Sequence, residues 1–199
     1  MIILYCFICR YTQASEEGCA RGTYLLGHLY LKGKLNASKT KTFNLLKQAA
    51  RGGETDAFYA LGTCYETGVG VEINLDLALQ NYRTSAQGGS KIGMYSLGYL
   101  LVQNAIEMRK RIKQMRPYAA TAHSRVLTGS AVVMENNSDD IYFAELREDA
   151  EATLQEGIHW LRSASENHIK DAAFQLGRLY EQVRYFNVLF AYLRKLCIV

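Results

Sequence analysis

The sequence predicts an all-α protein built from repeated helix–turn–helix units that stack into a solenoid. Its 199 residues include a single proline, Pro117, beside sixteen glycines, whereas average usage would give about ten prolines. Sandwich folds and βαβ enzymes normally place prolines in their loops, so this scarcity indicates helices joined by short turns. Two further observations agree: a Leu-Gly-x-x-Tyr pattern recurs along the chain, and apolar residues spaced by three and four precede it.

The Leu-Gly-x-x-Tyr pattern marks one helix of each unit, here called helix A. Full copies span 26–30, 61–65 and 176–180, and a degenerate copy at 97–101 has leucine in place of tyrosine. A glycine inside a helix costs about 1 kcal/mol relative to alanine. Its recurrence at one register therefore predicts that a second helix approaches closely there. The signature residues are Gly27, Tyr30, Gly62, Tyr65, Gly98, Gly177 and Tyr180.

A second amphipathic helix, here called helix B, precedes each later glycine at a fixed distance. Its apolar stripe and terminal residue share the same offsets in each unit: Phe43, Leu46, Ala50 and Gly53; Leu79, Tyr82, Ala86 and Gly89; Ile158, Leu161, Ser165 and His168. The glycines after these helices are expected to supply left-handed C-caps. Counted back from Gly27, the same offsets fall on Ile8, Tyr11, Ser15 and Gly18, so the apolar N-terminal run is predicted to be a helix B, not a targeting signal.

These patterns divide the chain into units. We expect a partial repeat at 1–19, repeats at 20–53, 54–90 and 91–168, and a partial repeat with an apolar tail at 169–199. The third repeat carries an insertion at about 104–152, predicted to be an extended helical hairpin. Its first arm is expected to end at Pro117, and a polar loop around 124–138 to join the arms. Because the series opens on helix B and closes on helix A, we expect a fragment of a longer protein or an incomplete gene model.

The two arms of the insertion carry opposite charge. Residues 109–125 hold six basic residues and no acid, whereas residues 135–156 hold eight acids and one base. We expect antiparallel arms to pair these blocks. The alternative is a nuclear signal or a nucleic-acid contact through Arg109–Lys113, but no basic stripe or exposed aromatic set accompanies the run.

The second unit resembles the Sel-one-like repeat family, the relatives of tetratricopeptide repeats. The resemblance is carried by Ala57, Leu61-Gly62, Tyr65, the loop Gly68-Val69-Gly70-Val71 and the N-cap Asn74. It extends to 20–53, where Ser38 takes the N-cap position, and to 157–181. The resemblance implies a tetratricopeptide-like α–α superhelix and a non-catalytic scaffold or adaptor role.

The resemblance also implies that helix A lines the concave face and binds a partner protein or peptide there. The positions three residues before and one residue after the signature glycine combine stacking area with hydrogen-bonding groups. The alternative is that these aromatic residues serve packing alone. The predicted binding residues are Tyr24, His28, Tyr59, Thr63, Tyr95, Tyr99, Phe174 and Arg178.

The sequence also leaves alternatives to the scaffold function. One alternative is a regulatory subunit or activator of an enzyme complex, such as the endoplasmic-reticulum-associated degradation machinery. A β-lactamase-like hydrolase is suggested only by Ser38-x-x-Lys41, without the accompanying Ser-Asp-Asn or Lys-Thr-Gly motif. Cys6-x-x-Cys9 lacks the second ligand pair of a structural zinc site. We therefore expect no catalytic residue, no cofactor and no metal.

The expected partners are other proteins or peptides, with no small-molecule substrate. The apolar N-terminal run is too short to span a bilayer, which takes about 20 residues, and uncapped ends favour self-association. Five cysteines, an odd number, favour a reducing compartment. This points to the cytoplasm, with the endoplasmic reticulum as the alternative.

Overall fold

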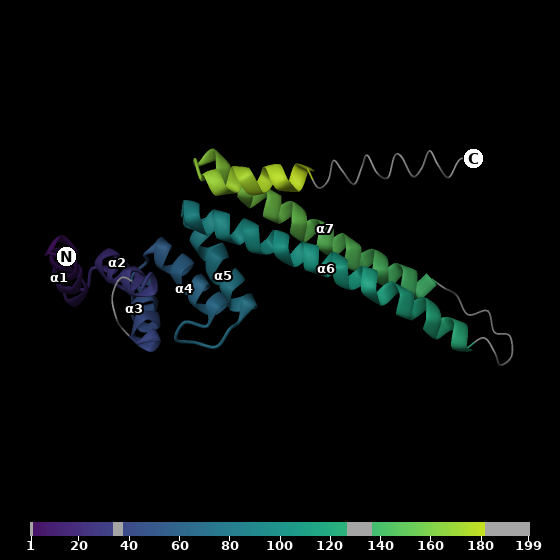
Figure 1. Ribbon diagram of the computed structural model, residues 1–199, viewed down its shortest axis with the longest axis horizontal. Coiled ribbons are helices and arrows are strands. Elements are labelled where there is room, and N and C mark those ends of the chain that lie inside the picture. The colour runs from purple at the N-terminus through teal and green to yellow at the C-terminus, as the bar shows by residue number, and fades with distance from the viewer. Residues whose placement is uncertain (1, 34–37, 127–136, 182–199) are drawn as a thin grey trace. The chain divides into compact units, whose positions relative to one another are not determined.

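The computed structural model describes residues 2–33, 38–126 and 137–181, which form helices joined by short turns with no strand in these ranges. The predicted all-α fold is confirmed. The chain divides into two compact units, one of residues up to Leu97 together with those from Leu161 onward, the other Gly98–Trp160. The helices are α1 (Ile2–Glu16), α2 (Ala20–Leu31), α3 (Lys39–Arg51), α4 (Thr55–Thr67), α5 (Leu75–Gln87), α6 (Lys91–Val126) and α7 (Asn137–Glu166), followed by a helix over 170–181 (Figure 1).

The B helices begin and end as the sequence predicts. The Ser38 hydroxyl accepts a hydrogen bond from the Lys41 amide at 3.1 Å, and the Asn74 side chain accepts one from the Leu77 amide at 2.9 Å, so both are N-caps. After α3, Gly53 has φ +84°, the left-handed C-cap conformation. His168 takes the equivalent place after α7 with φ 67°, which is less favourable for a residue that has a Cβ.

The helices of the first unit stack in sequence order. Each of α1 to α4 packs against the next helix, and α2 also contacts α4, which is the helix A of the following repeat. The core contains Leu46, Ala57, Ala60 and Cys64, all 0% exposed. The alternation of A and B helices thus buries a continuous core that no single repeat encloses.

Small residues set the spacing between helices. A Cβ on Gly22 would lie 2.6 Å from the Cβ of Ala14, and one on Gly93 would lie 2.4 Å from the Ser85 hydroxyl oxygen. Both glycines come five residues before a signature glycine, and both face the preceding helix B. Their lack of a side chain therefore lets consecutive repeats pack closely.

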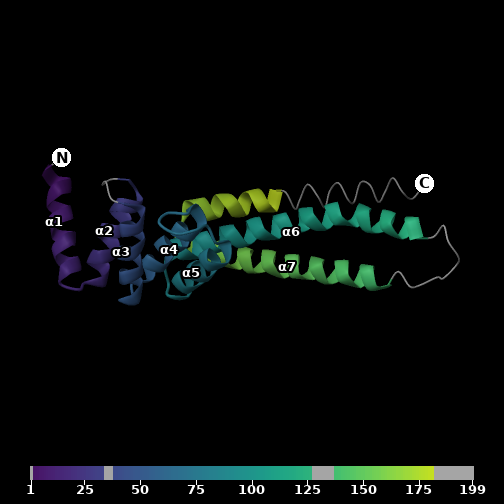
Figure 2. The ribbon, with the colours of Figure 1, turned by 90° about the horizontal axis from the view of Figure 1, so that it is seen from below.

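In the second unit, α6 and α7 run side by side as a helical hairpin (Figure 2). Ile112 on α6 and Phe143 and Ala150 on α7 are buried together, with Met108 and Leu146 packed against them. The prediction that Pro117 ends the first arm is wrong, because α6 continues to Val126. A proline in a helix interior costs about 3 kcal/mol, which the packing of Ile112 against Phe143 and Ala150 can offset.

The predicted polar loop around 124–138 is wrong at both edges, because α6 reaches Val126 and α7 begins at Asn137, and the rest of it lies outside the described residues. The basic run divides its ion pairs between two helices. Arg109 pairs with Glu151 of α7, whereas Lys110 and Arg111 lie 3.8 and 3.6 Å from Glu107 of their own helix. Pairing between the arms is therefore shown for Arg109.

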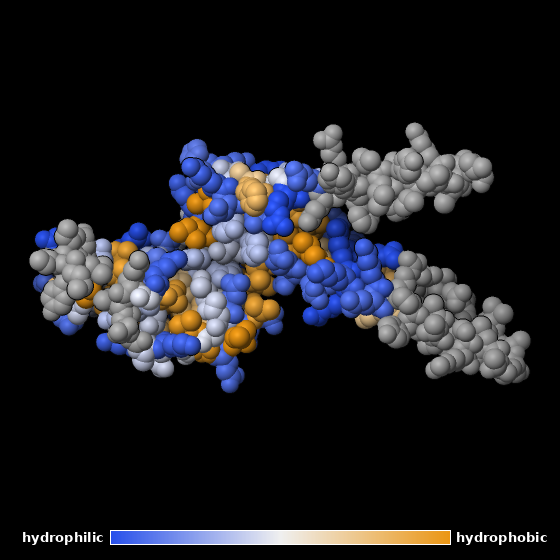
Figure 3. All heavy atoms as spheres, viewed as in Figure 1, coloured by the Kyte–Doolittle hydropathy of each residue, from blue (hydrophilic) through white to orange (hydrophobic). Residues whose placement is uncertain are grey.

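Figure 3 shows hydrophobic residues scattered among hydrophilic ones over the described helices. The exposed large apolar side chains of the first two repeats lie in the loop after α4 and at the start of α5: Ile73, Leu75 and Leu77 are 67%, 46% and 37% exposed. In the described ranges, no helix combines the length and the hydrophobicity needed to cross a membrane. The predicted apolar tail, 183–199, lies outside the described residues.

Candidate functional site

The first two A helices bring three of the predicted binding residues together. The rings of Tyr24 and His28 on α2 stack at 5.5 Å with an interplanar angle of 13°. Tyr24 is only 5% exposed, and burial raises its pKa to about 12, with Asp56 and Tyr59 of α4 adding to the shift. Tyr24 is therefore part of the packing between α2 and α4, whereas His28 is half-buried.

Tyr59 and Thr63 on α4 face the following helix B. The Tyr59 ring stacks on Tyr82 at 6.0 Å, and the Tyr82 hydroxyl donates a hydrogen bond to Glu66 at 2.6 Å and lies 3.3 Å from the Thr63 hydroxyl. Burial raises the pKa of Tyr82, as does its bond to Glu66. We did not predict Tyr82 as part of this face. The sequence signal that could have identified Tyr82 is its position in helix B, which is the same as that of Leu46 in the preceding repeat.

The remaining predicted residues lie on later A helices and are more open. Tyr95 on α6 is half-buried, and Tyr99, one turn later, is 37% exposed. On the helix over 170–181, Phe174 is 64% exposed and Arg178 is also exposed. Tyr99 belongs to the second compact unit and the other three to the first.

The signature residues pack as the repeat predicts in the first two units. A Cβ on Gly27 would lie 2.9 Å from Leu46, and one on Gly62 would lie 2.5 Å from the Tyr82 ring. Gly98 is buried as well, whereas a Cβ on Gly177 would meet no described atom within 4 Å. A close approach of helix B to the signature glycine is thus observed at Gly27 and Gly62.

The signature tyrosines differ in their surroundings. Tyr65 packs edge-on against Phe43 with ring centroids 5.5 Å apart, and Lys41 lies 5.8 Å from the ring centre of Tyr30. Tyr180 is 51% exposed and accepts a hydrogen bond from Arg162 at 3.3 Å. Tyr65 therefore contributes to the core of its repeat, and Tyr180 does not.

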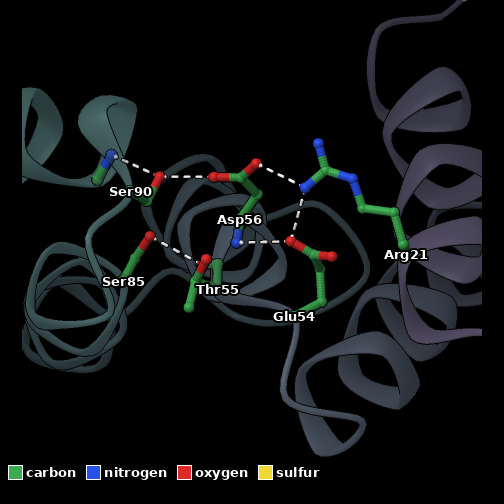
Figure 4. A network of polar contacts seen from close by, with 7 residues as sticks. Arg21, Glu54, Thr55, Asp56, Ser85 and Ser90 are labelled. Atoms are coloured by element: carbon green, nitrogen blue, oxygen red, sulfur yellow. Dashed lines mark hydrogen bonds and ion pairs between the residues drawn. The ribbon is translucent and has the colours of Figure 1, made fainter.

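A polar network joins the beginnings of three A helices (Figure 4). Arg21 on α2 reaches Glu54 at 2.8 Å and Asp56 at 3.1 Å, both at the start of α4. The other oxygen of Asp56 accepts a hydrogen bond of 2.6 Å from the Ser90 hydroxyl, and Ser90 precedes α6. Ser85 of α5 donates to the Thr55 carbonyl at 2.9 Å. The network therefore links the starts of three consecutive A helices to the Asp56 carboxylate.

His28 is expected to make the fold less stable in acid. Burial lowers its pKa below 6.5, and Lys32 lowers it further, while Asp56 opposes the shift. As pH falls, the unfolded chain takes up the proton first, so stability is complete above pH 6.5 and is lost as pH falls toward the lower folded pKa. The urea midpoint of the wild type should therefore drop more between about pH 7 and about pH 5 than that of His28→Gln. An equal drop in the urea midpoint of the wild type and of His28→Gln would contradict this role of His28.

Of the motifs that suggested other chemistry, Ser38-x-x-Lys41 has a structural role. Ser38 caps α3 through the Lys41 amide, so the Ser-x-x-Lys match is explained by the start of a helix. Cys64 is buried and burial raises its pKa to about 12, whereas Cys9 and Cys19 are exposed. Within the described ranges, no group of three or more His, Cys, Asp or Glu side chains is arranged to hold a metal ion.

The helical fold and the packed A and B helices define a class of protein: an α–α solenoid of helix–turn–helix repeats with one extended helical hairpin. Three stretches, 20–54, 55–90 and 154–168, match the model of the Sel1 repeat. These three stretches are similar to Sel1 repeats, and the resemblance seen in the sequence is confirmed. Proteins of this family typically mediate protein–protein interactions and are generally non-catalytic.

This chain is similar in sequence or in fold to several known proteins. The DAP3-binding cell death enhancer 1 of Rattus norvegicus is 33% identical over 79 residues, which cover 40% of this chain but only 15% of that protein. A Sel1 repeat protein from Oxalobacter formigenes is 18% identical with a TM-score of 0.53, covering 85% of this chain and 96% of that one. This likeness shows the fold. The protective antigen c5321 of uropathogenic Escherichia coli is 22% identical with a TM-score of 0.42, covering 86% and 43%.

Proposed function

We propose that this chain is a non-catalytic scaffold or adaptor that binds a partner protein or peptide through its A helices. The observation that carries the proposal is the recurrence of an aromatic residue at one register of each A helix, with a second polar or aromatic residue one turn later. Rigid aromatic rings provide contact area at a small cost in conformational entropy. Sel1 repeats typically serve this kind of interaction.

Exposure along the register decides which of these residues are best placed to bind. Tyr24 is 5% exposed and fully used in packing, whereas Tyr99 is 37% and Phe174 is 64% exposed. A side chain contributes to affinity only if it loses solvent contact on binding. We therefore place the binding contribution of the register on Tyr59, Tyr95, Tyr99 and Phe174 rather than on Tyr24.

The test compares a face variant with a matched control. Proteins captured by the wild-type chain from cells of its source would be identified by mass spectrometry, and a captured protein would be purified for titration. The Tyr95→Ala/Tyr99→Ala variant should raise Kd by about 30-fold, which corresponds to the loss of about 2 kcal/mol at a binding hot spot. The control is Ile141→Ala/Tyr142→Ala, which removes side chains 57% and 54% exposed on α7.

Circular dichroism would first show that both variants melt with the wild type. An unchanged Kd for the face variant would refute the proposal, as would equal loss of affinity in the control. A regulatory role within an enzyme complex would use the same face, and the identity of the captured partner distinguishes it from a simple adaptor.

A further inference from the structure

A pocket lies in the first unit among α3, α4 and α5, which follow one another in Figures 1 and 2. Its volume is about 260 Å³. Phe43, Leu61 and Tyr65 supply its apolar wall, and Lys47, Arg51 and Asn81 lie at its edge. None of these residues belongs to the predicted binding register of the A helices, so the pocket is a separate feature.

The apolar wall is rigid and aromatic. Phe43 and Leu61 are 9% and 6% exposed, so each is fixed by the core of the repeat. The rings of Phe43 and Tyr65 meet edge-on at 86°. The volume falls below the roughly 300 Å³ at which sites for drug-sized ligands begin, and the pocket therefore suits one large side chain rather than a small-molecule cofactor.

The edge of the pocket is positively charged. Lys47 and Arg51 are exposed and lie one helical turn apart on α3, where two like charges disfavour each other. The Lys47 ammonium lies 6.0 Å from the centre of the Phe43 ring. Among the described residues, no carboxylate forms an ion pair with either side chain. Two basic groups thus border an apolar pocket whose described lining includes no carboxylate.

We propose that this pocket binds an acidic segment of a partner protein. One aromatic side chain of that segment enters the pocket between α3 and α4. Carboxylates that flank this anchor pair with Lys47 and Arg51. Ion pairs at an exposed rim contribute selectivity and association rate, while the buried anchor contributes most of the affinity. The proposal stands apart from the predicted A-helix binding residues, because none of them lines the pocket and each set can be substituted separately.

Fluorescence anisotropy tests the proposal with a defined probe and the full chain. The probe is a fluorescein-labelled peptide with a central phenylalanine flanked on each side by two glutamates. Matched peptides carry glutamine in place of glutamate, or alanine in place of phenylalanine. The acidic phenylalanine peptide should bind saturably, and each matched peptide should bind about tenfold more weakly or worse.

Charge reversal at the pocket should reproduce this loss. Lys47→Glu/Arg51→Glu should raise Kd for the probe at least about tenfold, while Lys91→Glu/Arg147→Glu makes the same change in charge at exposed positions elsewhere and should leave Kd within about twofold of the wild-type value. Absence of saturable binding would overturn the proposal. So would equal binding of the alanine peptide, or of a labelled oligothymidylate, since either result would mark a general polyanion surface.

Discussion

Replacing Gly62 by alanine is expected to lower the free energy of unfolding by about 1–3 kcal/mol, although alanine is the better helix former. The new methyl group would lie 2.5 Å from one carbon of the Tyr82 ring and 2.6 Å from another. Tyr82 is 2% exposed and its hydroxyl is held by Glu66, so the ring cannot move away freely. Either α4 and α5 separate or the hydrogen bond to Glu66 is lost.

Gly177→Ala is the matched control, because it makes the same change at the same position of the Leu-Gly-x-x-Tyr motif. No described atom lies within 4 Å of the added carbon. The higher helix propensity of alanine should therefore raise the free energy of unfolding by up to about 1 kcal/mol. Urea denaturation followed by far-UV circular dichroism measures both changes. Effects of the same sign would show that the motif glycine is not selected by the approach of helix B.

Removing the Asp56 carboxylate is the second large effect that we expect, with Asp56→Ala costing about 2–3 kcal/mol. The variant leaves the Ser90 hydroxyl, on a residue 6% exposed, without its acceptor at 2.6 Å, and it also breaks the contact with Arg21. The starts of α2, α4 and α6 thus lose the contacts that they share through Asp56. In a solenoid, stability depends on such contacts between neighbours.

Asp56→Asn separates the two contributions. Its side-chain oxygen can still accept from Ser90, while the ion pair with Arg21 is lost. The Arg21 side chain is 58% exposed, and exposed ion pairs contribute about 0–1 kcal/mol. The asparagine variant should therefore lose less than about 1 kcal/mol in the same urea assay. A loss as large as that of the alanine variant would assign the stabilisation to Arg21 instead of Ser90.

The structure differed from the sequence prediction where neighbours rather than local pattern decide. Pro117 predicted a helix end because a proline removes a backbone donor, yet α6 continues to Val126 beside α7. Likewise, Tyr24 and Phe174 occupy the same position in the repeat, but the first is 5% and the second 64% exposed. Register fixes the direction of a side chain within its helix, and the next helix decides whether that side chain is covered.

The sequence by itself determined the A and B helices of the first two repeats, the caps of α3 and the N-cap of α5, because these follow from the periodicity of apolar positions and from the backbone requirements of glycine, serine and asparagine. Ser38, Asn74 and Gly53 act as their positions predict. Only the tertiary structure decided what fills the space above each signature glycine, Leu46 in one repeat and Tyr82 in the next. It also decided that Lys47 and Arg51 border an aromatic pocket. These arrangements depend on contacts between residues distant in sequence, which a repeat pattern does not specify.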